Sequence, residues 1–255
     1  MAIKRREFLG HMAVGGAVLT MPALLQGCGV QNATAVSQAT PENPFMTWFG
    51  VDQVTAARVM SELTARGADA SDLYFPHTRS NSVRLEDGIV SSASSGIQQG
   101  VGLRVVIGEQ TGYAFTEDLT MPSMLAAART ASAIASGSAV AAPQAFNALG
   151  TGDLYTTTVP WSDVGIDQKL PVLKFVEEKA KAMDPAIDKV AVYWSDADER
   201  VMIATLDGKL VTDHRPMTRL TVVVTAKRDG EVQTGYSNIA AREEFGWYNE
   251  ERILK

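Results

Sequence analysis

Cysteine and histidine are scarce in this chain of 255 residues, which contains one cysteine and three histidines. A single cysteine excludes a disulfide bond within the chain. Cys28 and His11 belong to an N-terminal leader, which leaves His77 and His214, far apart in sequence and without a neighbouring cysteine or second histidine. No zinc site of recognisable spacing can be assembled from them, so we interpret each as a surface or strand-end residue.

Basic residues are fewer than acidic ones. The chain has 23 lysines and arginines and 29 aspartates and glutamates, which gives a formal net charge of -6. Lys4, Arg5 and Arg6 outnumber Glu7 by two in the leader, so the residues after it carry -8. This balance argues against nucleic acid as a partner, because phosphates repel an acidic surface. Neither Ser-x-x-Lys nor Gly-x-Ser-x-Gly occurs in the sequence, so a serine hydrolase is not supported.

Long apolar runs are missing, apart from one modest stretch near the N-terminus. That stretch is interrupted by glycine, threonine and proline, and it is shorter than the roughly 20 residues that span a bilayer. The residues ahead of it, Arg5-Arg6 followed by Phe8 and Leu9, resemble the twin-arginine signal. We therefore predict a signal peptide over residues 1–28 and export by the twin-arginine route, rather than a transmembrane anchor.

The end of the leader contains the single cysteine. The tetrapeptide LQGC that ends at Cys28 resembles a lipobox, which predicts that Cys28 is acylated and becomes the new N-terminus. Ordinary signal-peptidase cleavage nearby is the alternative. Residues 29–48, which are rich in Ala, Thr, Gln and Ser, then form a linker. The mature protein is expected in the periplasm, either free or held at the membrane by lipid at Cys28.

Helical and strand periodicities alternate in the rest of the chain. Helices are predicted where apolar residues recur at every third or fourth position, over residues 51–66, 122–135 and 166–183. Strands are predicted where apolar and polar residues alternate, around residues 73–75, 83–85, 101–107, 190–194, 201–204, 210–213, 220–225 and 232–237. Turn signals at Asp87-Gly88 and at Gly108 indicate hairpins, so the sheet should be antiparallel.

The same order of helix and strands returns in the second half of the chain. The tetrapeptide QTGY occurs at 110–113 and again at 233–236. The chain is therefore predicted to be α+β, with two tandem repeats of a helix plus an antiparallel β-sheet. We place the two α+β domains at residues 49–150 and 151–255.

An acidic cluster lies between two of the predicted strands of the second half. It consists of Asp196, Asp198 and Glu199. Carboxylates of this kind bind hard cations, but aspartate is also favoured in turns, where it forms local hydrogen bonds. We interpret the cluster as a hairpin turn rather than as a cation site.

Four segments of the first half carry a family resemblance: DLYF at 72–75, RLEDGIV at 84–90, GIQQGVGLR at 96–104 and GEQTGYA at 108–114. In this order they resemble the N-terminal domain of the TldD/PmbA (TldD/TldE) metallopeptidase family, and they favour its TldD branch. The resemblance begins near Phe49. The segment after Trp161 is similar to the family's central domain, and residues 240–255 are similar to the approach to its catalytic domain.

The resemblance implies a zinc-dependent peptidase that cuts unfolded peptides inside an enclosed chamber, built by a TldD subunit and a PmbA/TldE-like subunit. In the family, the metal motif belongs to a C-terminal catalytic domain, and this sequence stops at Lys255 before such a motif begins. No catalytic or metal-binding residue can be carried over, so we predict no cofactor in this chain and zinc in a full-length relative. We expect the end at Lys255 to reflect a fragment or a truncated gene model.

Two functions are compatible with these expectations. The first is the N-terminal portion of an exported TldD-like metallopeptidase, which supplies the chamber wall and the interface for a PmbA/TldE-like subunit or for a second copy. The alternative is a non-catalytic peptide-binding or partner lipoprotein, which would either hold a peptide by strand addition at a sheet edge or only pack against a partner. Neither involves nucleic acid, and contact with the membrane is expected only through the signal or the lipid anchor.

Overall fold

Strands from both halves of the chain join in one sheet in the computed structural model, which describes residues 43–135, 141–150, 154–155 and 157–255. The described residues all belong to one compact unit. Within those ranges, no helix combines the length and the apolar character needed to cross a membrane. The predicted signal and lipidation residues lie outside the described part, namely Arg5, Arg6, Phe8, Leu9 and Cys28.

The helices of the described part are α1 (Pro44–Phe49), α2 (Gln53–Leu63), α3 (Met121–Ile134), α4 (Ile166–Lys181) and α5 (Glu250–Ile253), with the 3-10 helices η1 (Trp161–Asp163) and η2 (Phe245–Trp247). The three helices predicted from periodicity are present as α2, α3 and α4. Local chemistry explains where α2 begins, because the Asp52 carboxylate accepts a hydrogen bond from the backbone N–H of Thr55 at 2.7 Å. Gly50 ends α1 with a left-handed backbone, at φ 69°.

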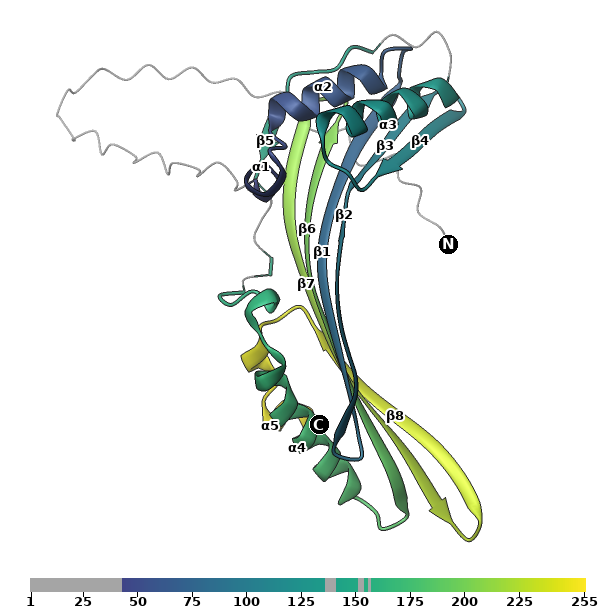
Figure 1. Ribbon diagram of the computed structural model, residues 1–255, viewed down its shortest axis with the longest axis vertical. Helices are drawn as coiled ribbons and strands as arrows, with labels where there is room; N and C mark the ends of the chain where they lie inside the picture. Colours follow the sequence, from purple (N-terminus) through teal and green to yellow (C-terminus); the bar gives the residue numbers. More distant parts are fainter. Residues whose placement is uncertain (1–42, 136–140, 151–153, 156) are drawn as a thin grey trace, which may run out of the picture. The chain divides into compact units, whose positions relative to one another are not determined.

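The sheet contains β1 (Ala70–Glu86), β2 (Ile89–Gln99), β3 (Val101–Ile107), β4 (Gln110–Thr116), β5 (Asn147–Leu149), β6 (Ile187–Thr205), β7 (Lys209–Arg228) and β8 (Glu231–Ala241). Its strand order is β4-β3-β1-β6-β7-β5, while β2 also pairs with β1 and β8 also pairs with β7 (Figure 1). Every described pairing is antiparallel except the short one between β5 and β7. The prediction of an α+β fold is confirmed, and the predicted antiparallel pairing is found for every described pair except β5 with β7.

Three strands are much longer than the sequence pattern predicts. β1 has 17 residues, β6 has 19 and β7 has 20, and each joins two segments that the pattern separates. Apolar alternation marks the two ends of each strand, whereas the middle carries polar residues, so the pattern alone finds two short strands. The prediction of separate strands at 190–194 and 201–204 is therefore wrong, because both belong to β6.

Two-residue turns connect the long strands to their outer neighbours. Asp87 and Gly88 link β1 to β2 with φ angles of 49° and 76°, and Asp229 and Gly230 link β7 to β8 with φ angles of 52° and 87°. Two consecutive positive φ angles match the right-handed twist of a hairpin, and Asp-Gly is among the pairs that tolerate them best. The hairpin predicted at Asp87-Gly88 is confirmed.

Two hydrophobic cores form on one face of the sheet, toward opposite ends of the long strands. Figure 1 shows the helices that cover them, with α2 and α3 near one end of the long strands and α4 near the other. The first lies under α2 and α3 and includes Met60, Leu63, Leu73, Phe75, Leu103 and Val105. The second lies under α4 and η1 and includes Val83, Leu85, Trp161, Leu173, Trp194 and Leu220. Each fully buried side chain of this kind stabilises the fold by about 1.5–3 kcal/mol relative to its exposed state.

The predicted arrangement of two tandem repeats is not confirmed. β1, from the first half, pairs with β6, from the second half, over residues 72–86 and 191–205. Because these two central strands hydrogen-bond along nearly their whole length, the halves share one sheet. The proposed domain division near residue 150 stays a prediction.

Candidate functional site

Polar side chains separate the two cores on the face of the sheet that the helices cover. Phe75 of β1 belongs to the first core and Val83 belongs to the second. Since alternate residues of a strand share a face, the odd-numbered residues between them point the same way. Polar residues of β6 and β7 lie beside them in the register. Together these residues form what we call the polar band: His77, Arg79 and Asn81 of β1, Asp196, Asp198 and Arg200 of β6, and His214 and Thr218 of β7.

A buried ion pair forms one end of the polar band. Lys169 of α4 places its Nζ 2.6 Å from Oδ2 of Asp196, and their side chains are only 3% and 0% exposed. Trp194 also donates to that oxygen at 2.9 Å, while Asn81 donates to Oδ1 at 2.8 Å. A buried carboxylate is tolerated only when it is paired and hydrogen-bonded. This cluster therefore joins α4 to the centre of the sheet.

A second carboxylate of the band is paired with histidine. His214 of β7 donates through Nε2 to Oδ1 of Asp198 at 2.6 Å, and Nε of Arg200 lies 3.7 Å from the same oxygen. Burial raises the pKa of Asp198, but the hydrogen bond from His214 and the charges of His214, Arg200 and Arg79 outweigh it. The net pKa lies below its ordinary value, so Asp198 is an anion at neutral pH.

The third feature of the band is the buried imidazole of His77, which lies against α1. Its ring centre is 4.5 Å from that of Trp48 and 5.9 Å from that of Phe49. Burial lowers the pKa of His77, and the nearby charge of Arg79 lowers it further. His77 is therefore neutral at pH 7 and packs as part of the contact between α1 and β1.

The stability of this contact should depend on pH. Because the folded-state pKa of His77 lies below its ordinary value of 6.5, the unfolded chain binds the extra proton first as pH falls. We expect the free energy of unfolding to decrease from pH 7 to about pH 5. His77→Gln should flatten the profile over that window, as measured by urea unfolding at several pH values. Parallel profiles for the two proteins would contradict this assignment.

The structure corrects two interpretations made from the sequence. Asp196, Asp198 and Glu199 do not form a hairpin turn but lie within β6. His77 and His214 are not strand-end residues, since both lie within long strands and His77 is buried. Ion pairing across the sheet offsets the charge of the aspartates, which overrides their local preference for turns. A usable signal was present: positions 77, 79 and 81 continue the period-2 pattern of 73, 75, 83 and 85 with polar residues.

Next to the band, the sheet has a hollow of about 470 Å³ lined by Arg79, Asn81, Ser95, Gly96, Ile97 and Ser162. Arg79 pairs in register with Ile97 of β2, and Asn81 pairs with Ser95, so these four side chains share a face. Arg79 is exposed, and among the residues that the structure describes its guanidinium has no hydrogen-bond or ion-pair partner. The hollow thus offers an unpaired cation beside neutral polar groups.

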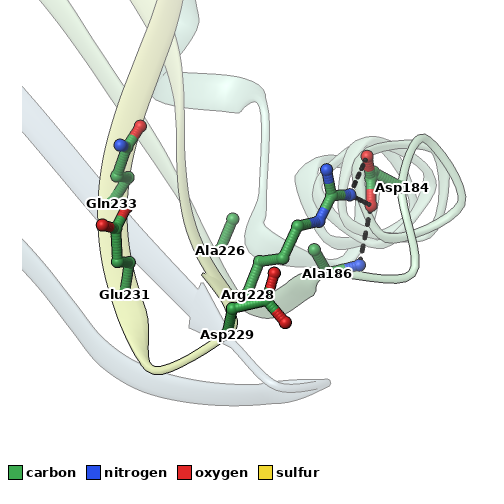
Figure 2. A pocket seen from close by; sticks show the side chains of 7 residues that line it. All are labelled: Asp184, Ala186, Ala226, Arg228, Asp229, Glu231 and Gln233. Carbon is green, nitrogen blue, oxygen red and sulfur yellow. Dashed lines mark hydrogen bonds and ion pairs between the residues drawn. The ribbon is translucent and has the colours of Figure 1, made fainter.

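A second hollow, of about 490 Å³, lies between the loop after α4 and the β7–β8 hairpin (Figure 2). Its arginine is occupied: Nη2 of Arg228 lies 3.0 Å from each oxygen of Asp184. The backbone N–H of Ala186 also donates to Asp184, and together these bonds lower the pKa of that carboxyl. Arg228 is already paired with Asp184, and this ion pair holds the β7–β8 hairpin against the loop. We therefore assign the hollow a structural role.

Two consecutive parts of the chain match one protein family. Residues 71–135 match the PmbA/TldA metallopeptidase domain 1, and residues 159–252 match the PmbA/TldA metallopeptidase central domain. The chain is 30% identical over 211 residues to a metalloprotease TldD homolog of Haemophilus influenzae, covering 82% of this chain and 44% of that relative. A metalloprotease TldD homolog of Buchnera aphidicola from Acyrthosiphon pisum is 23% identical over 189 residues. The match covers 74% of this chain and 39% of that relative.

Solved structures share the fold at lower sequence identity. A candidate modulator of DNA gyrase from Bacteroides thetaiotaomicron superposes with a TM-score of 0.62 at 17% identity, over 79% of this chain and 49% of that one. TldE from Thermococcus kodakarensis superposes with a TM-score of 0.50 at 14% identity, over 73% and 43%. The chain spans less than half the length of the curated relatives it matches. Through its matches to domain 1 and to the central domain, the chain belongs to the PmbA/TldD family.

Proposed function

We propose that this chain forms the first and central domains of a TldD-like zinc metallopeptidase that acts on unfolded peptides. The observation that carries the proposal is the succession of both family domains in one chain, together with 30% identity to a metalloprotease TldD homolog. In this role the long sheet supplies part of a chamber wall. It also supplies an interface for a PmbA/TldE-like subunit or for a second copy of the chain.

The zinc of such an enzyme does not fit the described residues. The polar band offers one candidate donor pair, but His214 and Asp198 are bonded to each other, and Arg200 stands beside the same carboxylate oxygen. Asp196 is likewise saturated by Lys169, Asn81 and Trp194. Within the described ranges no group of three or more His, Cys, Asp or Glu side chains is arranged to hold a metal. No catalytic step is therefore assigned to these residues.

We further propose that the protein is exported. The support is the N-terminal sequence, in which Arg5 and Arg6 precede Phe8 and Leu9 as in a twin-arginine signal. Twin-arginine export carries folded proteins, so zinc could be acquired before the membrane is crossed. Lipid attached at Cys28 would then hold the mature protein at the membrane surface.

One experiment tests the enzyme and the anchor together. The native gene product is purified from membranes of its source, and its intact mass, its zinc content and its hydrolysis of an unfolded peptide are measured. We expect one zinc per catalytic unit, loss of hydrolysis with a chelator, and a mass that includes lipid at Cys28. A metal-free product without hydrolysis would contradict the peptidase, and an unmodified Cys28 would contradict the lipid anchor.

A specific observation favours the second candidate, a non-catalytic peptide-binding lipoprotein. β2 pairs only with β1 among the described strands, and all of its residues are exposed except the last, which is half-buried. A strand with one unpaired edge can accept another strand by backbone hydrogen bonds. Binding of a peptide to the same purified product, measured alongside its hydrolysis, would support this candidate if binding occurred without hydrolysis.

A further inference from the structure

The unpaired edge of β2 has an unusual composition. Its sequence, IVSSASSGIQQ, contains no charged residue and no proline over 11 residues. Proteins commonly protect exposed edge strands with charges, prolines or bulges, because an unprotected edge recruits other strands. The register shift of the β1–β2 pair lies near the hairpin, between Arg84 and Leu85 of β1. The part of β2 from Ser92 to Gln99 therefore pairs regularly and leaves a continuous edge.

The hollow beside β2 provides hydrogen-bond donors for an anion. The Arg79 guanidinium has five N–H groups, and no described residue accepts from them. Asn81 donates one of its two amide N–H groups to Asp196 and retains the other. Ser95, whose side chain carries a hydroxyl, lines the same hollow. A planar guanidinium beside neutral donors is suited to a carboxylate, which it can bind through two parallel hydrogen bonds.

The charges around the hollow are compatible with an anionic ligand. Arg79 is its only charged lining residue. The two carboxylates opposite Arg79 and Asn81 in the register have bonded partners of their own, Asp196 with Lys169 and Asp198 with His214. Arg79 acts on Asp198 only through its charge, without a hydrogen bond or ion pair to it. Asp163 accepts a hydrogen bond from Ser162 at 3.2 Å but does not line the hollow.

We infer that an extended peptide pairs with the free edge of β2 and places an acidic side chain in the Arg79 hollow. Such a peptide would lie two strands from β1, about 9–10 Å away, a distance that an arginine and a glutamate can bridge together. The hollow lies within β2 rather than at its end, so a side chain is the better match than a terminal carboxylate. This inference rests on the proposed peptide substrate and specifies it as an extended segment with an acidic residue.

The test uses the 255-residue chain and two fluorescent peptides. Both are 11-residue, extended, Thr- and Val-rich sequences that differ only by a central Glu or Gln. By fluorescence anisotropy, we expect the Glu peptide to bind about tenfold more tightly, as is typical of a hydrogen bond to a charged group. Arg79→Gln should remove that difference, and Arg79→Lys should retain part of it. Arg219→Gln, on the opposite face of the sheet, is the matched control and should retain the full difference.

A second readout locates the peptide. The amide protons of β2 should become protected from hydrogen exchange when the Glu peptide is added, whereas those of another edge strand, β8, should not. Equal affinities for the two peptides, no binding of either, or protection elsewhere would overturn the inference. So would β2 protection that grows with protein concentration alone, because it would identify a second copy as the occupant. Binding is read without hydrolysis, so an inactive peptidase leaves this test unaffected.

Discussion

Replacing Asp196 with alanine should lower the free energy of unfolding by about 3–5 kcal/mol, the usual cost of breaking a buried ion pair by removing one partner. The substitution leaves the Lys169 ammonium buried without a counter-charge, because its side chain is only 3% exposed. It also removes the acceptor of the Asn81 and Trp194 hydrogen bonds. Urea unfolding followed by tryptophan fluorescence measures the effect.

Two further variants separate charge from packing at this site. Lys169→Met combined with Asp196→Leu removes both charges and should recover much of the lost stability, since a buried pair can often be replaced by apolar residues. Glu62→Ala, which breaks a partly exposed pair with Arg129, is the control and should cost at most about 1 kcal/mol. If Asp196→Ala cost no more than Glu62→Ala, the buried pair would not join α4 to the sheet.

Replacing Gly112 with alanine should also be strongly destabilising. A Cβ atom at this position of β4 would overlap the backbone carbonyl oxygen of Ala131 in α3, and it would lie 3.1 Å from Cγ1 of Val105. The obstacle is helix backbone rather than a side chain that can rotate, so α3 must move away from the sheet. We expect a loss of about 3 kcal/mol, the upper end of the cost of overpacking, measured by urea unfolding.

Gly235 provides the matched control for Gly112. Gly235 occupies the same position in the second QTGY tetrapeptide, but its Cβ would meet only Cγ2 of Val224, at 3.9 Å. Gly235→Ala should therefore leave stability unchanged or raise it by about 0.5–1 kcal/mol, because alanine loses less backbone entropy in a strand. Similar losses for the two variants would show that α3 does not pack on β4 at Gly112.

The environment of the polar band could not be predicted from the sequence pattern. The pattern identifies Asp196 and Asp198 as an acidic cluster, but the preference of aspartate for turns predicts a hairpin there instead of a strand. Their partners come from positions that are distant in sequence, namely Lys169, Asn81 and His214. No spacing rule connects these residues, because their proximity depends on the pairing of β1, β6 and β7 and on the seating of α4. The sequence likewise gives no indication that the Arg79 guanidinium lacks a hydrogen-bond partner.

The sequence by itself determined several features of this protein, through interactions between residues close together in the chain. Helical periodicity predicted α2, α3 and α4, Asp-Gly predicted the turn at Asp87-Gly88, and successive motifs indicated the family, because each of these depends on residues close together in the chain. Tertiary structure alone decided that strand segments merge into three long strands, that both halves share one sheet, and that two identical tetrapeptides meet different surroundings. The physical reason is that burial, ion pairing and strand register depend on contacts between residues far apart in sequence, and these contacts can override local preference.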